Sequence, residues 1–128
     1  MKKVINVLLI LMSFSLISCS KSSSTTTTTT PSSFQGNWTG RFTGTQDNGT
    51  WTATISATGV VTGTAYSAVF MGSSALNGTV TNQGSFTATV GSSTDGARFS
   101  GNLTGTTGSG TWVNTSAGMS GNWTGTKN

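Results

Sequence analysis

Apolar residues and glycine alternate with polar residues through most of residues 34–127. The first stretch shows this best, because every second residue from position 34 to position 44 is Phe, Trp or Gly, and every residue between them is polar. Successive side chains of a β-strand point to opposite faces, so a period of two predicts a strand with one buried face. Helical periodicity is missing from this region, which favours the all-β class.

The same alternation recurs along the chain and predicts about eight strands in residues 34–128. The later strands are expected around residues 50–55, 61–65, 76–81, 85–90, 98–105, 111–113 and 119–125. Turn signals separate them at residues 46–49, 57–59, 82–84, 92–96, 107–110 and 115–118. In the first of these turns, Asn48-Gly49 favours a type I′ turn. Connections this short make neighbouring strands antiparallel.

An internal repeat indicates how the sheet ends. Gly-Asn-Trp-Thr-Gly occurs at residues 36–40 and again at residues 121–125. We expect the first and last strands to pair, with Trp38 near Trp123, and to close the sheet into one small antiparallel up-and-down β-barrel. Closure removes both edges of a sheet whose strands carry few charges to protect them. The alternative that the same alternation allows is a β-sandwich.

The composition argues against enzyme chemistry. The chain has no His, a single Cys and only two acidic residues, Asp47 and Asp95. Since it offers no imidazole base and too few carboxylates for a metal site, we expect no enzymatic activity, no metal and no cofactor. Asp47 and Asp95 are expected to form turns. The few basic residues are scattered and form no stripe, so nucleic acid is not an expected partner.

The N-terminal segment carries a targeting signal. Two lysines precede an apolar run over residues 4–17, which is shorter than the roughly 20 residues of a membrane-spanning helix. The run ends in Leu-Ile-Ser-Cys at residues 16–19, which resembles the lipobox of bacterial lipoproteins. This resemblance implies a signal peptide over residues 1–18, cleavage before Cys19, and fatty-acyl chains such as palmitate on Cys19 that anchor the protein to a membrane.

Residues 19–33 comprise the lipidated Cys19 and a Ser/Thr-rich tract. The tract has no apolar side chain to bury, so it predicts a disordered tether. A flexible coil of this length spans about 20 Å r.m.s.. The residue after Cys19 is Ser20, whereas an Asp there usually retains such lipoproteins in the inner membrane of Gram-negative bacteria. The resemblance therefore implies a lipid-anchored protein of the bacterial outer membrane.

The folded region also resembles small barrels of known families. An opening Gly-x-Trp strand followed by short hairpins is similar to the avidin and lipocalin barrels, and residues 54–69 are similar in texture to the second and third strands of avidin-like proteins. The resemblance implies eight strands around an interior that is filled by side chains or holds one small ligand. The aromatic cage around biotin is not matched, so no biotin-binding residue is implied.

Two groups of apolar side chains are candidates for ligand or partner contact. The first group could line an internal pocket or simply form the core, and it comprises Trp38, Trp51, Trp112 and Trp123. The second lies in the apolar connection 66–71, which could be a portal, a contact surface or a longer third strand with a bulge; its members are Tyr66, Phe70 and Met71.

The sequence therefore predicts a non-enzymatic binding module for a small apolar ligand, a glycan or an envelope protein. One alternative is a purely structural envelope lipoprotein with a filled core. Another is an accessory or inhibitor of a second envelope protein.

Replacing Cys19 with alanine tests the lipobox. Alanine has no sulfur to carry the lipid, so Cys19→Ala is expected to leave the signal peptide uncleaved and to abolish the acyl mass on the N-terminal peptide. Mass spectrometry and membrane fractionation measure both effects. Globomycin, which inhibits lipoprotein signal peptidase, should give the same precursor from the unchanged chain. A Cys19→Ala protein that is still processed and membrane-bound would show that the lipobox assignment is wrong.

Overall fold

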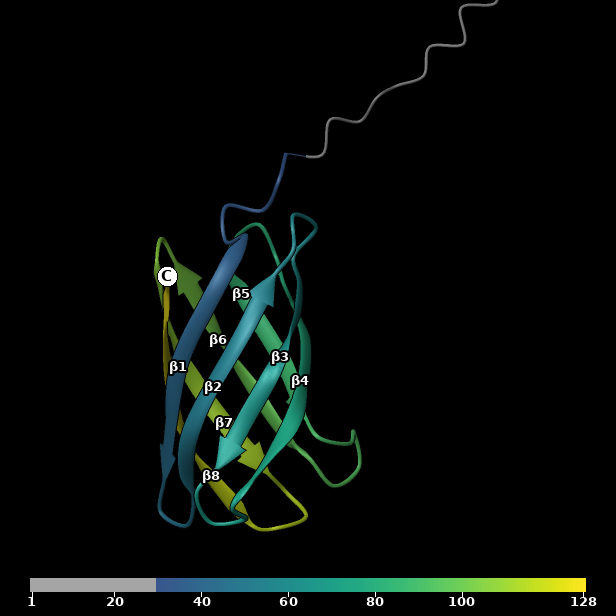
Figure 1. Ribbon diagram of the computed structural model, residues 1–128, viewed down its shortest axis with the longest axis vertical. Helices are drawn as coiled ribbons and strands as arrows, with labels where there is room; N and C mark the ends of the chain where they lie inside the picture. Colours follow the sequence, from purple (N-terminus) through teal and green to yellow (C-terminus); the bar gives the residue numbers. More distant parts are fainter. Residues whose placement is uncertain (1–29) are drawn as a thin grey trace, which may run out of the picture.

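The computed structural model describes residues 30–128. The expected signal peptide, Cys19 and most of the Ser/Thr tract lie outside the described residues. The described part is all-β (Figure 1), and its eight strands are β1 Gly36–Gly44, β2 Asn48–Ile55, β3 Val60–Ser67, β4 Gly72–Val80, β5 Ser85–Val90, β6 Ala97–Thr104, β7 Thr107–Asn114 and β8 Met119–Lys127. In these residues there is no helix of the length and apolarity needed to cross a membrane.

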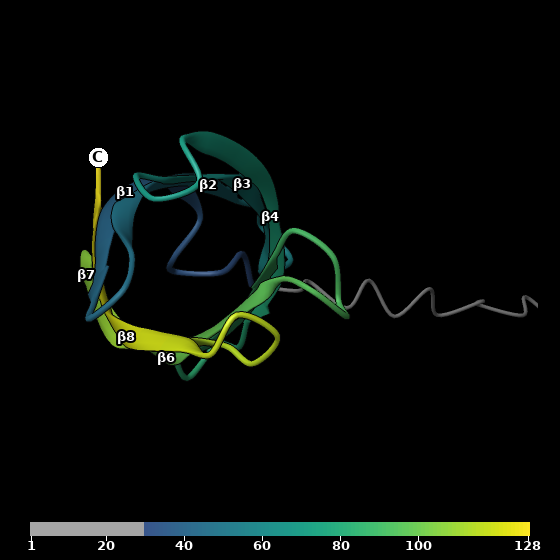
Figure 2. The ribbon, with the colours of Figure 1, turned by 90° about the horizontal axis from the view of Figure 1, so that it is seen from below.

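The strands form a closed up-and-down barrel. Each strand pairs antiparallel with the next along the chain, and β1 pairs antiparallel with β8. Figure 2 looks along the barrel and shows the strands as a continuous ring. The predicted closure is confirmed, and the alternative of two packed sheets is excluded.

The register makes the barrel narrow. The paired residues can be followed around the ring, starting at Gly36 on β1. The path returns to β1 at Gly44, which is eight residues further along the strand. On the way it passes one residue of each other strand, namely Ile55, Val61, Gly78, Ala88, Phe99, Trp112 and Gly121. Eight strands with a stagger of eight tilt by about 36° and enclose an interior just wide enough for side chains to fill.

Large aromatic rings occupy the middle of this interior. The ring centroids of Trp51 and Trp123 lie 5.8 Å apart in an edge-to-face arrangement, and Phe86 lies 5.0 Å from Trp123. All three side chains are buried. Aromatic pairs at such separations are favourable beyond the area that they bury. The middle of the barrel is therefore a packed core and not a channel.

Glycines on the inner face make room for these rings. A Cβ added at Gly125 would overlap the Trp51 ring, and one at Gly40 would lie 2.5 Å from the same ring. A Cβ added at Gly110 would lie 2.7 Å from Nε1 of Trp123. Glycine weakens a strand interior, and its use here follows from the size of the rings that face it.

The segment before β1 closes one end of the barrel. Phe34 is buried there, and its carbonyl oxygen accepts a hydrogen bond from Nε1 of Trp38 at 2.8 Å. Ser32 is also buried, and its backbone N–H donates to the carbonyl oxygen of Ala57 at 2.8 Å. Ser32 and Phe34 therefore pack against the closed end of the barrel. Residues 30–128 contain a sheet without edges and a complete core, which is what a segment needs to fold independently.

The predicted neighbourhood of Trp38 and Trp123 is wrong. The register places Trp123 opposite Phe42, and Trp38 opposite Lys127. Rings of this size at one level would compete for the same narrow interior. The offset instead lets Trp38 fill the closed end, while Trp123 fills the middle.

The expected turn at residues 107–110 is also wrong. These residues begin β7, where Gly110 provides space for the Trp123 ring. The chain reverses just before them, at Gly105 and Thr106, and Gly105 has a φ of 60° that favours glycine.

The expected type I′ turn at Asn48-Gly49 is wrong for a similar reason. Both residues lie in β2, and Gly49 is paired with Phe42. A Cβ added at Gly49 would lie 2.6 Å from Cζ of Phe42. In both places the glycine clears space for a ring and does not turn the chain.

Replacing Gly125 with alanine tests the packing of rings on glycine. The added methyl group would collide with the Trp51 ring, so we expect Gly125→Ala to lower the free energy of unfolding by about 1–3 kcal/mol. Urea unfolding followed by tryptophan fluorescence measures the change.

Gly72→Ala is the matched control. The atom nearest to a Cβ added at Gly72 would be 3.7 Å away. The free energy of unfolding is therefore expected to change by no more than about 0.5 kcal/mol. Equal effects of the two substitutions would contradict the proposed role of the inner glycines.

Candidate functional site

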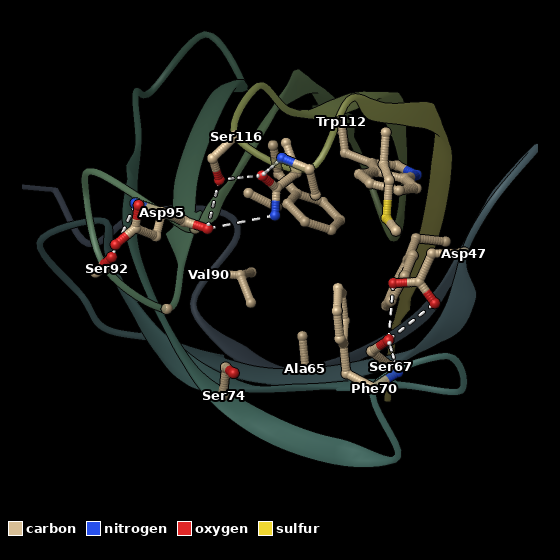
Figure 3. Close-up of a pocket in the computed structure, with 18 of the residues that line it drawn as sticks. Asp47, Ala65, Ser67, Phe70, Ser74, Val90, Ser92, Asp95, Trp112 and Ser116 are labelled. Carbon is tan, nitrogen blue, oxygen red and sulfur yellow. Dashed lines mark hydrogen bonds between the residues drawn. The ribbon is translucent and has the colours of Figure 1, made fainter.

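A pocket opens at the end of the barrel opposite the segment that precedes β1. It has a volume of about 510 Å³ and lies among the loops β1–β2, β3–β4, β5–β6 and β7–β8 (Figure 3). We call it the mouth pocket. Its apolar lining includes Phe42, Ala65, Phe70, Val90, Ala97, Phe99, Trp112 and Met119. Its polar lining includes Asp47, Ser67, Ser74, Ser92, Asp95, Asn114 and Ser116.

Three aromatic rings form the floor of the mouth pocket. Phe42 lies edge-to-face against Phe99 at 5.7 Å and against Trp112 at 5.4 Å, while Phe99 and Trp112 are stacked at 6.2 Å. Nε1 of Trp112 donates to the carbonyl oxygen of Thr43 at 3.1 Å, which fixes the indole. This floor separates the pocket from the packed middle and presents apolar surface to anything that enters.

Asp47 joins two of the loops at the rim. It is only 5% exposed. Its carboxylate accepts hydrogen bonds from the backbone N–H of Asn48 at 2.8 Å, from the hydroxyl of Ser67 at 2.8 Å and from the backbone N–H of Val69 at 3.3 Å. Because Ser67 and Val69 belong to β3 and the following loop, this carboxylate holds the β1–β2 connection against the β3–β4 connection.

The β3–β4 loop projects an apolar tip beside the pocket. The hydroxyl of Ser67 accepts a hydrogen bond from the backbone N–H of Phe70 at 3.1 Å. Phe70 is 62% exposed but lines the pocket, and Figure 3 shows its ring extending over the mouth. Met71 has a φ of 51°, a conformation that a bulky side chain seldom adopts. The tip is therefore held in a defined conformation by the Asp47 network.

The opposite side of the rim carries Asp95 (Figure 3). Its carbonyl oxygen accepts hydrogen bonds from Nδ2 of Asn114 at 3.4 Å and from the hydroxyl of Ser116 at 3.2 Å, and its backbone N–H donates to the hydroxyl of Ser92 at 2.9 Å. These bonds connect the β5–β6 loop with the β7–β8 loop. Both acidic residues therefore occur at the mouth, on different loops.

The structure separates the candidate residues into three groups. Trp112 and Phe70 line the mouth pocket. Three tryptophans are buried in the barrel core, namely Trp38, Trp51 and Trp123. Tyr66 and Met71 are exposed, and the segment 66–71 is the end of β3 followed by a loop, not a longer strand.

Several residues at the mouth were not among the candidates from sequence. Phe42 and Phe99 lie within predicted strands, but the alternation does not say at which level of the barrel each ring lies. Asp47 and Asp95 were interpreted as turn residues, and their loop positions agree with that. What the sequence did not indicate is that their two loops meet at one pocket.

The mouth pocket offers binding surface and hydrogen-bond acceptors. Within residues 30–128 no three side chains of the His, Cys, Asp or Glu type are grouped as a metal site would need.

No protein-family model matches the chain, and a search of curated proteins gives no match. The pocket itself is therefore the basis for inferring the function.

Replacing Ser67 with alanine tests the rim network. The substitution removes a donor to Asp47 and an acceptor for Phe70, so the amides of Val69 and Phe70 should exchange with solvent about tenfold faster, which corresponds to roughly one lost hydrogen bond. Amide hydrogen exchange measures this. Ser74→Ala is the control, since Ser74 also lines the pocket but lies outside this network. Unchanged exchange in Ser67→Ala would mean that the tip is fixed by other contacts.

Proposed function

We propose that this protein is a non-enzymatic binding module that takes one small, largely apolar molecule into the mouth pocket. The observation that carries the proposal is the pocket of about 510 Å³ above a floor of three aromatic rings. Small-molecule sites are typically clefts of about 300–1,000 Å³ with apolar walls and a few polar groups. The aromatic floor and the polar rim of the mouth pocket fit that description.

The packed middle of the barrel limits what can bind. Trp51, Phe86 and Trp123 fill the space below the floor, so a ligand inside the barrel would have to lie at the mouth. A volume of about 510 Å³ accommodates a small molecule but not a folded partner. These features favour a small ligand over the glycan and protein partners that the sequence left open.

The lipobox at residues 16–19 supports a location at the cell envelope. In this proposal, acyl chains on Cys19 anchor the protein, and Ser20 favours the bacterial outer membrane. Residues 30–35 lie at the closed end of the barrel, and the mouth is at the other end (Figure 1). An anchor that precedes residue 30 would thus approach the closed end and leave the mouth accessible.

Filling the pocket tests the proposed function. The neutral probe N-phenyl-1-naphthylamine becomes fluorescent in apolar surroundings, and we expect residues 30–128 to bind it with a dissociation constant of about 1–100 μM. Ala97 lines the pocket, so Ala97→Trp should weaken binding by about tenfold or more, because the indole occupies the ligand's space.

Val60→Trp is the matched control, because Val60 is an exposed residue at the start of β3, near the closed end. It should bind the probe like the unchanged protein. If the unchanged barrel binds no probe, or if both variants bind equally well, the mouth pocket is not a ligand site, and a purely structural role is favoured.

A further inference from the structure

The charges of the chain are distributed unevenly over the barrel. Asp47 and Asp95 are its only acidic residues, and both line the mouth pocket, whose described lining contains no basic residue. Arg41 and Arg98 are exposed on β1 and β6, and Nζ of Lys127 lies 3.5 Å from a backbone oxygen at the closed end. Both acidic residues therefore lie at the mouth, although the chain as a whole is basic.

The carboxylate of Asp47 keeps acceptor capacity. Its Oδ1 accepts three hydrogen bonds, from Asn48, Ser67 and Val69, whereas its Oδ2 accepts only from the Ser67 hydroxyl, which it shares with Oδ1. A carboxylate offers about four lone-pair sites. A nearly buried carboxylate is costly unless a cation compensates its charge. The described lining of the pocket supplies no such cation.

The apolar surface beside this carboxylate also favours a cation. The rings of Phe42, Phe99 and Trp112 line the pocket, and Phe70 lies over its mouth. Aromatic faces attract ammonium groups, and they do so more strongly where water is excluded. A ligand that combines an apolar body with a protonated nitrogen could use both features at once.

We infer that the mouth pocket selects protonated amines that carry an apolar or aromatic group. The ammonium group donates to Oδ2 of Asp47, and the apolar body lies on the aromatic floor. Asp95 adds a second negative charge on the opposite side of the pocket. This inference rests on the proposed function and narrows its ligand class. Anionic amphiphiles such as fatty acids are disfavoured by the same two carboxylates.

Three probes with one skeleton test the selection. They are 4-phenylbutylamine, 4-phenylbutan-1-ol and 4-phenylbutyrate, which are cationic, neutral and anionic at neutral pH. Residues 30–128 labelled with nitrogen-15 are titrated with each probe, and the indole N–H signal of Trp112 reports binding, while that of Trp38 at the closed end is the internal reference. The amine should bind about tenfold more tightly than the alcohol, and the carboxylate more weakly than the alcohol. Added salt should narrow these differences.

Variants assign the selection to the two carboxylates. Asp47→Asn should bring the affinity for the amine close to the affinity of the same variant for the alcohol. Because Asp47 also holds two loops together, exposed Asp95 provides a second variant, and Asp95→Asn should weaken amine binding about twofold to threefold.

The double variant Asp95→Asn, Asn82→Asp is the matched control for net charge. It restores the charge in the exposed β4–β5 turn at the closed end, and it should behave like Asp95→Asn alone.

Three results would overturn the inference. If the amine and the alcohol bind equally, the pocket does not select cations. If the amine's advantage survives in both Asp variants, the two carboxylates do not recognise the ammonium group as inferred. The proposed function stands in either case. If none of the three probes shifts the Trp112 signal, both the inference and the proposed function are wrong.

Discussion

Aromatic rings that lie directly on glycine backbone determine the interior of this barrel. With a stagger of eight residues around eight strands, the inner space is too narrow for large side chains from every strand. Trp51 and Trp123 fit because the strands that face them carry glycine at the points of contact. The glycines therefore have a packing role that their effect on strand propensity would not suggest.

This packing also decides where a ligand could bind. The rings of Trp51, Phe86 and Trp123 close the middle, and the segment with Phe34 closes the end where the chain enters. At the opposite end, where the mouth pocket lies, no segment of the described residues closes the barrel in this way. The floor of the pocket is the triad of Phe42, Phe99 and Trp112, and its walls are the four loops. The mouth pocket is thus a consequence of how the rest of the barrel is filled.

Hydrogen bonds that involve side chains join the loops around the mouth, in addition to backbone bonds such as that from the N–H of Ala68 to the carbonyl oxygen of Asn48. Asp47 and Ser67 connect two loops, and the carbonyl oxygen of Asp95 connects the other two. In both cases a residue that favours turns also makes contacts between loops. The sequence can indicate that such a residue forms a turn. Which other loop the residue contacts depends on which loops the barrel brings together.

Much of the architecture could be predicted because a period of two is a local property. The alternation assigned inward-facing residues such as Trp51 and Phe99, and short connections implied antiparallel neighbours. The glycines at residues 107–110 and at Gly49 were misinterpreted, because glycine is typical both of turns and of strands that face a large ring. Only knowledge of the ring opposite distinguishes the two cases.

The sequence by itself determined that this chain forms about eight antiparallel strands with an aromatic inner face, since strand geometry alone assigns alternate residues to one side. The tertiary structure decided the level of each ring, the position of Trp123 opposite Phe42, and the meeting of Asp47 and Asp95 at one pocket. The physical reason is that register accumulates over every strand pair around the ring. The total offset around the ring cannot be read from any single strand, and it is fixed only when β1 pairs with β8.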